Sequence, residues 1–299
     1  YFIYVFLCFY IEVTINRQRK ERRMGEKDIT EKVLADYNDI FSDIVNVLLF
    51  QGEEVVQENE LESQSTVSMY KTDGSIHEQE RDVSKVWKRK DIKISILGLE
   101  HQTGYDALMP LRVMGYDGAS YRAQCLEPNV NKCPVITMVL HFGNKKWDKN
   151  RFLSECFNIP VELKSYFSDY RINVFDIAYL SDEQVSLFKS DFRIVADYFV
   201  QMRKNRTYSP SKDTIKHVDE VLKLMSVLTE DTRFENVQRA EGKVDNMCQF
   251  LDEVEAKGVE KGEFKMLVKL VSDGTITIQK AAETAGMDED AFKRKMKEV

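Results

Sequence analysis

The sequence is poor in the residues that build disulfide scaffolds and zinc clusters. Its 299 residues include only five cysteines and four histidines. The cysteines are odd in number, lie far apart and form no C-x-x-C pair; they are Cys8, Cys125, Cys133, Cys156 and Cys248. These absences exclude a disulfide-rich scaffold and a zinc finger, and they favour a reducing, cytoplasmic environment.

Proline and positive charge are scarce as well. Five prolines and no low-complexity tract exclude a proline-rich linker or fibre, and a net charge of −7 argues against coating nucleic acid through overall charge. A local basic groove stays possible. The remaining composition, 43% hydrophobic and 31% charged, is that of a soluble protein with one large or two smaller domains.

The sequence also lacks an apolar run of the length that a standard membrane helix needs. Its first 15 residues, YFIYVFLCFYIEVTI, contain Glu12, and basic residues follow the run instead of preceding it. A spanning helix needs about 20 apolar residues, and a secretory signal carries its positive charges first. We expect residues 1–23 to be a non-native leader before a start at Met24, without stable membrane association. A short signal anchor on a membrane-bound sensor is the alternative.

Hydrophobic spacing predicts alternating helices and strands in the first two thirds of the chain. A helix is expected over 29–50, a strand hairpin over 81–89 and 92–103, and a polar, turn-rich segment at 53–76. A helix over 106–124 precedes buried strands at 133–143 and 172–180. This order predicts an α/β fold, with a mixed central β-sheet flanked by helices.

From about residue 182 the spacing becomes helical throughout. Helices are expected over 183–204, 209–228 and 276–296, with a domain boundary near Ser209. We therefore expect a domain at 24–208 and a C-terminal helical region at 209–299. Segment 276–296 is similar to a helix-turn-helix with Gly286 at its turn. Because acids at 288–290 would repel phosphates, we favour packing or homo-oligomer formation for it.

Two acids stand near the inner ends of the predicted hairpin strands. Side chains alternate along a strand, so Glu100 and Gln102 point to one side, and an in-register hairpin brings Asp82 close to Glu100. Carboxylates held that close repel each other unless a cation shares them. Mg²⁺ or Mn²⁺ suits such a site, with the backbone carbonyl of His101 as a further ligand.

The ordered motifs resemble the recombination-promoting nuclease (Rpn) family of the PD-(D/E)XK nuclease superfamily. The resemblance covers about residues 30–200 and is carried by five segments: NDIFSDIVNVLLF, ERDVSKVW, LGLEHQT, MPLRVMGYDGASYRAQ and CPVITMVLHFG. It implies a magnesium-dependent DNA endonuclease linked to recombination or mobile elements. In it, Asp82, Glu100 and Gln102 would be catalytic.

The resemblance also implies secondary positions and one departure from the superfamily. Asp39 matches the aspartate of the opening helix, and Arg112 and Tyr116 lie on the helix that follows the E-x-Q motif. The superfamily has a lysine where this chain has Gln102. A neutral amide can orient water but supplies no charge, so weaker activity is expected.

Basic residues flank the predicted site in sequence and are the candidates for DNA binding. They are Lys85, Lys88, Arg89, Lys145 and Lys146. Simpler interpretations remain open: solvated basic turns, an ion pair between Glu100 and Arg112, and a solvated Asp39. The alternative function is a nuclease fold kept as a non-catalytic DNA-binding or assembly module.

Overall fold

The computed structural model describes residues 34–72, 75–90, 92–127, 131–229 and 246–296. The chain divides into two compact units. Unit 1 comprises the described parts of 1–210 and 216–235, and unit 2 those of 211–215 and 236–299. The expected division at 208/209 puts the helix at 218–229 with the C-terminal region, whereas the structure groups that helix with unit 1.

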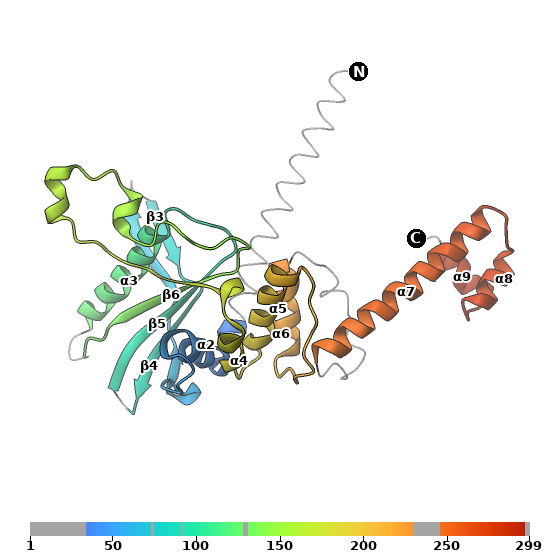
Figure 1. The fold of residues 1–299 in the computed structure, drawn as a ribbon, viewed down its shortest axis with the longest axis horizontal. Helices are drawn as coiled ribbons and strands as arrows, with labels where there is room; N and C mark the ends of the chain where they lie inside the picture. The colour runs from blue at the N-terminus through green and yellow to red at the C-terminus, as the bar shows by residue number, and fades with distance from the viewer. Residues whose placement is uncertain (1–33, 73–74, 91, 128–130, 230–245, 297–299) are drawn as a thin grey trace, which may run out of the picture. The chain divides into compact units, whose positions relative to one another are not determined.

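A five-stranded mixed sheet forms the centre of unit 1, as the sequence predicts (Figure 1). The strand order is β1 (Leu61–Ser63), β4 (Val83–Arg89), β5 (Ile92–Gln102), β6 (Val135–His141) and β7 (Asn173–Asp176). The first three strands pair antiparallel, and β5, β6 and β7 run parallel. The predicted hairpin is confirmed as β4 and β5. The carboxyl ends of the three parallel strands therefore meet at one edge of the sheet.

Helices cover both faces of this sheet, which explains the apolar character of β6. Helix α3 (Met109–Leu126) begins with a proline in its first turn and connects β5 to β6. It lies on one side, and α2 (Asn38–Phe50), α4 (Asp182–Leu187) and α5 (Phe192–Asn205) lie on the other (Figure 1). Under α3, Met109 and Val113 pack with Val139 and Val174 of the sheet.

The helix expected over 29–50 is interrupted in the described residues. Residues before 34 lie outside the described part, residues 34 and 35 are helical, and α2 starts at Asn38 after an extended residue, Tyr37. The interruption has a physical cause. The buried ammonium of Lys85 donates to both the backbone carbonyl and the carboxylate of Asp36, each at 2.6 Å, which occupies a carbonyl that a continuous helix would use.

Two other expectations differ from the structure. The segment at 53–76 contains short β1 and a separate hairpin of β2 (Val67–Thr72) and β3 (Ser75–Glu80). The helix expected over 183–204 is divided into α4 and α5. Asp43 of α2 causes the break, because its carboxylate accepts hydrogen bonds from the backbone N–H groups of Lys189 and Ser190 at 2.9 and 2.7 Å.

The remaining helices complete the two units. Helix α6 (Val218–Thr229) belongs to unit 1. Unit 2 contains α7 (Met247–Ser272), α8 (Ile278–Thr284) and α9 (Glu289–Met296). Phe264, Ala281 and Phe292 form its small core. Gly286 adopts a φ of 66° between α8 and α9, the left-handed conformation that the predicted helix-turn-helix needs at its turn.

Candidate active site

The E-x-Q motif lies at the carboxyl end of β5, where Glu100 and Gln102 share one face of the sheet. The Glu100 carboxylate is almost fully buried, with 1% of its side chain exposed. The Gln102 side-chain amide donates to Glu100 Oε1 at 3.3 Å. The amide is less buried than the carboxylate, so it lies between the buried acid and solvent.

The second oxygen of Glu100 is the atom that most directly indicates a cation-binding site. Within the described residues, Oε2 is buried and has no hydrogen-bond partner. Burial and the nearby Asp82 carboxylate together raise the pKa of Glu100 to about 8, although Arg112 opposes the shift. A buried carboxylate oxygen without a donor is costly, and a cation would remove that cost.

Asp82 lies beside Glu100, just before β4 begins, where the carboxyl end of β5 extends beyond its pairing with β4. Val83 pairs with Leu99, so Asp82 follows opposite Glu100 in the register. The Asp82 carboxylate accepts a hydrogen bond from the His101 backbone N–H at 2.7 Å, taking the place of a strand partner. Because the N–H and C=O of one strand residue face the same side, the His101 carbonyl faces this edge too.

The His101 side chain has a role that sequence reasoning missed. Its ring is buried, and Nδ1 lies 3.5 Å from the Asp82 carboxylate. The ring also stacks on Phe142, with centroids 6.0 Å apart. The His101 backbone N–H therefore holds the Asp82 carboxylate, and the imidazole lies beside the same carboxylate.

Arg112 and Tyr116 extend the site from α3. Arg112 Nη2 donates to Glu100 Oε1 and to the Tyr116 hydroxyl, the latter at 3.2 Å, and Nη1 donates to Asp106 at 3.1 Å. The ion pair between Glu100 and Arg112, one of the simpler interpretations of the sequence, is thus present. It occupies only one carboxylate oxygen, and 39% of the Arg112 side chain stays exposed.

A buried ion pair holds the residue before Asp82. Arg81 Nη2 lies 2.8 Å from Asp117 of α3, and the side chains of both are at least 95% buried. Asp117 also accepts from Thr137 of β6 at 2.6 Å, and the Arg81 guanidinium lies 5.6 Å from the centre of the Tyr116 ring. The chain leading into Asp82 is therefore tied to α3 and β6.

The structure adds a histidine and an aspartate that the sequence did not single out. In the parallel register, Gln102 lies opposite His141 of β6, and His141 lies opposite Asp176 of β7. His141 Nδ1 lies 2.8 Å from Asp176 Oδ1, and both side chains are buried. Only the strand register reveals this pair, since 34 residues separate its members in the chain.

The chain was compared with known proteins on this basis. The family described as "Putative transposase, YhgA-like" matches residues 85–233. The chain belongs to this family. No curated protein and no solved structure matches it. The YhgA-like family is the Rpn family of PD-(D/E)XK type, so the resemblance seen in the sequence is confirmed. The matched segment includes Glu100, Gln102, Arg112 and Tyr116, and it begins three residues after Asp82.

The remaining site residues predicted for this YhgA-like protein are dispersed. Asp39 of α2 pairs with Lys216 at 2.6 Å and His217 at 3.1 Å, near the start of α6. These two hydrogen bonds outweigh the effect of burial and lower the pKa of Asp39. Lys216 and His217 make a structural ion-pair cluster with Asp39, away from the Asp82 and Glu100 carboxylates in the hydrogen bonds of the described residues.

The basic residues on β4 do not form a patch at the site. Lys85 is a correction: its side chain is 1% exposed, and its ammonium donates to Asp36 and Ser63, so it cannot reach DNA in this structure. Lys88 pairs with Glu62, and Arg89 lies 3.4 Å from Glu60. Both lie at the far end of β4 from Asp82, roughly 20 Å away at about 3.3 Å per residue.

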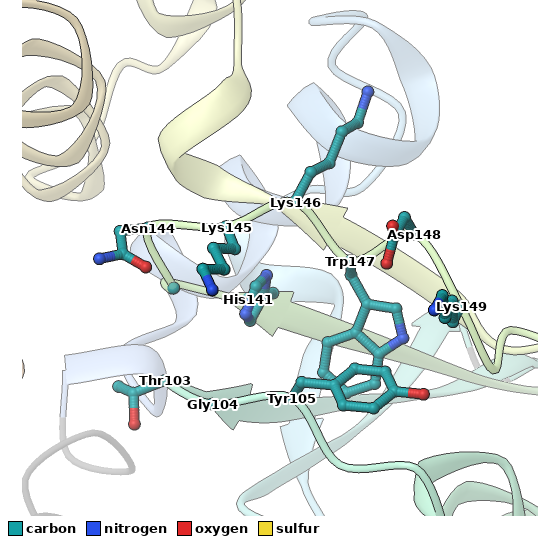
Figure 2. Close-up of a pocket in the computed structure, with 11 residues that line it drawn as sticks. Thr103, Gly104, Tyr105, His141, Asn144, Lys145, Lys146, Trp147, Asp148 and Lys149 are labelled. Atoms are coloured by element: carbon teal, nitrogen blue, oxygen red, sulfur yellow. The ribbon is translucent and has the colours of Figure 1, made fainter.

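Lys145 and Lys146, in contrast, are exposed and lie near the motif. They follow β6 and line a pocket of about 380 Å³ together with Thr103 and Tyr105, which follow β5 (Figure 2). In Figure 2 the Lys145 side chain points toward His141, whereas Lys146 points away from it. This loop is the part of the predicted basic surface that adjoins the carboxyl ends of the strands.

The described residues contain no group of three or more His, Cys, Asp or Glu side chains that could hold a metal. Two carboxylates and a carbonyl remain as the candidate ligands, a set that suits Mg²⁺, which commonly keeps several waters. In the same part of the chain, no helix has the length and apolarity to cross a membrane.

Proposed function

We propose that this YhgA-like protein is a metal-dependent DNA endonuclease. The observation that supports it most directly is the buried, partnerless Oε2 of Glu100 beside the Asp82 carboxylate. Asp82, Glu100 and the His101 carbonyl would hold Mg²⁺ or Mn²⁺. When bound, the ion would supply positive charge to the scissile phosphate and raise the acidity of water. The expected cellular location is the cytoplasm.

The protein's own side chains have distinct tasks in this proposal. Gln102 donates to Glu100, which leaves its amide oxygen to accept a hydrogen bond from the attacking water and so to orient it. Water loses a proton to solvent as its oxygen bonds to phosphorus, the P–O3′ bond breaks, and the departing 3′ oxygen takes up a proton from solvent, giving a 5′-phosphate and a 3′-hydroxyl. Arg112, partly exposed and adjacent to Glu100, supplies the fixed positive charge that Gln102 lacks relative to lysine.

A nicking assay tests this proposal. Supercoiled plasmid is incubated with the full chain, with Mg²⁺, Mn²⁺ or EDTA. Asp82→Asn and Glu100→Gln keep the side-chain shapes and remove the charges, and we expect each to reduce nicking by on the order of 100-fold or more. Glu162→Gln, at an exposed acid of the short helix η3 (Val161–Tyr166), is the matched control. Undiminished nicking by both site variants would overturn the proposal.

A second candidate is a nuclease fold that binds DNA or assembles without cutting it. It is favoured by Gln102 in place of lysine and by Arg112, which already offsets part of the Glu100 charge. Isothermal titration with Mg²⁺ and Mn²⁺ separates the two. Binding that Glu100→Gln abolishes supports the endonuclease, and no binding of either ion supports the second candidate.

A further inference from the structure

The side chain of His141 is buried, yet one of its ring nitrogens is directed to a pocket. Only 4% of the side chain is exposed. Asp176 engages Nδ1, while Asp176 also accepts from the Trp147 backbone N–H at 2.8 Å and from Arg151 at 3.2 Å. The Trp147 ring packs edge-on against the imidazole, with centroids 5.2 Å apart. These contacts fix the plane of the ring.

The other nitrogen, Nε2, is left for a ligand. Among the described residues it has no hydrogen bond, and it is not among the fully buried unpartnered atoms, so it keeps some access to the pocket that His141 lines. Gly143 keeps that access open. A Cβ on Gly143 would lie 2.3 Å from His141 Nε2, in the space next to the nitrogen.

The surroundings of this nitrogen suit an anion. Lys145, Lys146 and Lys149 line the same pocket against one acid, Asp148, and Lys145 points toward His141 (Figure 2). Asp176 holds Nδ1–H, so a ring that carries both protons directs its Nε2–H into the pocket, where it can donate to a phosphate oxygen. The pocket lies at the carboxyl ends of β5 and β6. Within it, His141 of β6 lies opposite Gln102 on the neighbouring strand.

We propose that His141, oriented by Asp176, binds a backbone phosphate of DNA in the pocket formed by residues 103–105 and 143–149. His141 lies on β6, next to the strand that carries Gln102, so the phosphate that it binds is a neighbour of the scissile phosphate. Lys145 adds a positively charged contact. This inference rests on the proposed function in that it takes DNA as the substrate, but it concerns binding and assigns no role in bond cleavage to His141.

The test measures DNA binding in the absence of divalent metal, so that metal-dependent cleavage cannot occur. Anisotropy of a labelled DNA duplex is followed with the full chain in EDTA over a series of salt concentrations. We expect His141→Gln, Gly143→Ala and Lys145→Ala each to weaken binding roughly tenfold. Lys145→Ala, which removes a positive charge, should also reduce the slope of log affinity against log salt by about one.

Matched variants make the result specific. Gly118→Ala, on the exposed face of α3 with nothing within 4 Å of its added carbon, is the control for Gly143→Ala and should bind as the parent does. Lys145→Ala alters an exposed side chain, so it tests the pocket even if a variant at His141 or Gly143 fails to fold.

Three outcomes would overturn the inference. In the first, the parent does not bind the duplex. In the second, His141→Gln and Gly143→Ala are both folded and bind the duplex as the parent does. In the third, Lys145→Ala binds as the parent does. Titration with inorganic phosphate separates the source of the ligand. If Gly143→Ala weakens phosphate binding but leaves duplex binding intact, the pocket serves a free anion and the DNA assignment is wrong. If the parent still nicks plasmid in these cases, the proposed endonuclease activity is retained and only the role of the pocket in binding DNA is rejected.

Discussion

At the scale of single residues, Glu100 is the most informative position in the chain. Its burial and the neighbouring Asp82 carboxylate disfavour its charged form and raise its pKa to about 8. A folded-state pKa above the unfolded value means that the folded protein binds this proton more tightly. Glu100 therefore does not destabilise the folded protein at pH values where it is protonated in both the folded and the unfolded state. Its destabilising contribution to the free energy of unfolding grows as pH rises from about 4.5 to about 8.

This sign gives a first prediction. The free energy of unfolding of the parent should fall relative to Glu100→Gln between pH 5 and pH 8, by a few kcal/mol at about 1.4 kcal/mol per pKa unit. Urea denaturation at the two pH values measures it. Mg²⁺ should raise the melting temperature of the parent more at pH 8 than at pH 5, because it stabilises the charged carboxylate. A parent and variant whose stabilities stay parallel across this range would contradict the prediction.

Lys85 gives a second prediction at the same scale. Its ammonium is bonded to Asp36 and Ser63 inside unit 1, so Lys85→Met should lower the free energy of unfolding by about 1–3 kcal/mol. Lys88→Met, at a more exposed lysine paired with Glu62, should change it by less than about 1 kcal/mol. Urea denaturation compares the two. Equal stabilities would mean that Lys85 is not held as the structure shows.

At the scale of elements, the close approach of Arg81 to β5 decides how the site is held. Gly98 lies where Arg81 crosses the strand, and a Cβ there would lie 2.5 Å from Arg81 Cδ. No side chain fits in that space without displacing the guanidinium from Asp117. The glycine in the strand is therefore explained by packing, and its effect reaches Asp82, the next residue after Arg81.

Replacement of this glycine gives the third prediction. Gly98→Ala should destabilise the protein by about 2–4 kcal/mol, because it strains the strand and disturbs a buried ion pair. Gly118→Ala is its control on α3, where alanine should stabilise the helix by about 0.5–1 kcal/mol. Denaturant midpoints measure both. A Gly98→Ala protein as stable as the parent would show that Arg81 can move without cost.

At the scale of the whole molecule, each unit has a core of its own. The core of unit 2 joins Phe264 of α7 to Ala281 of α8 and Phe292 of α9, and Phe292 is fully buried. Partly buried apolar residues, among them Leu267 and Ile278, pack against this core, so removal of the buried ring would leave a cavity among them. The site of unit 1 contains no residue of unit 2 among those described.

The fourth prediction uses this separation. Phe292→Ala should destabilise unit 2 by about 3–5 kcal/mol, the usual cost of removing a buried aromatic ring. Hydrogen exchange of the full chain should become faster in α8 and α9, with exchange in β5 and β6 and the Mg²⁺ response unchanged. Faster exchange throughout unit 1 would show instead that the two units fold as one.

The sequence by itself determined the elements whose local pattern is strong. The hairpin of β4 and β5, the helix α3 and the buried strand β6 follow from apolar spacing, with Pro110 at the start of α3 and with Pro134 and Gly143 flanking β6. The E-x-Q motif and Asp82 could be found in the same way, because alternation along one strand and register in one hairpin are local properties.

Only the tertiary structure decided which charged side chains are available for chemistry. The sequence treats Lys85 and Lys145 alike, yet packing against Asp36 buries one and leaves the other exposed at a pocket. The pairing of His141 with Asp176 depends on the parallel register of two strands separated by a long connection, which no local pattern specifies. Burial and long-range pairing are properties of the folded chain, and they set the charge and the partners of each candidate residue.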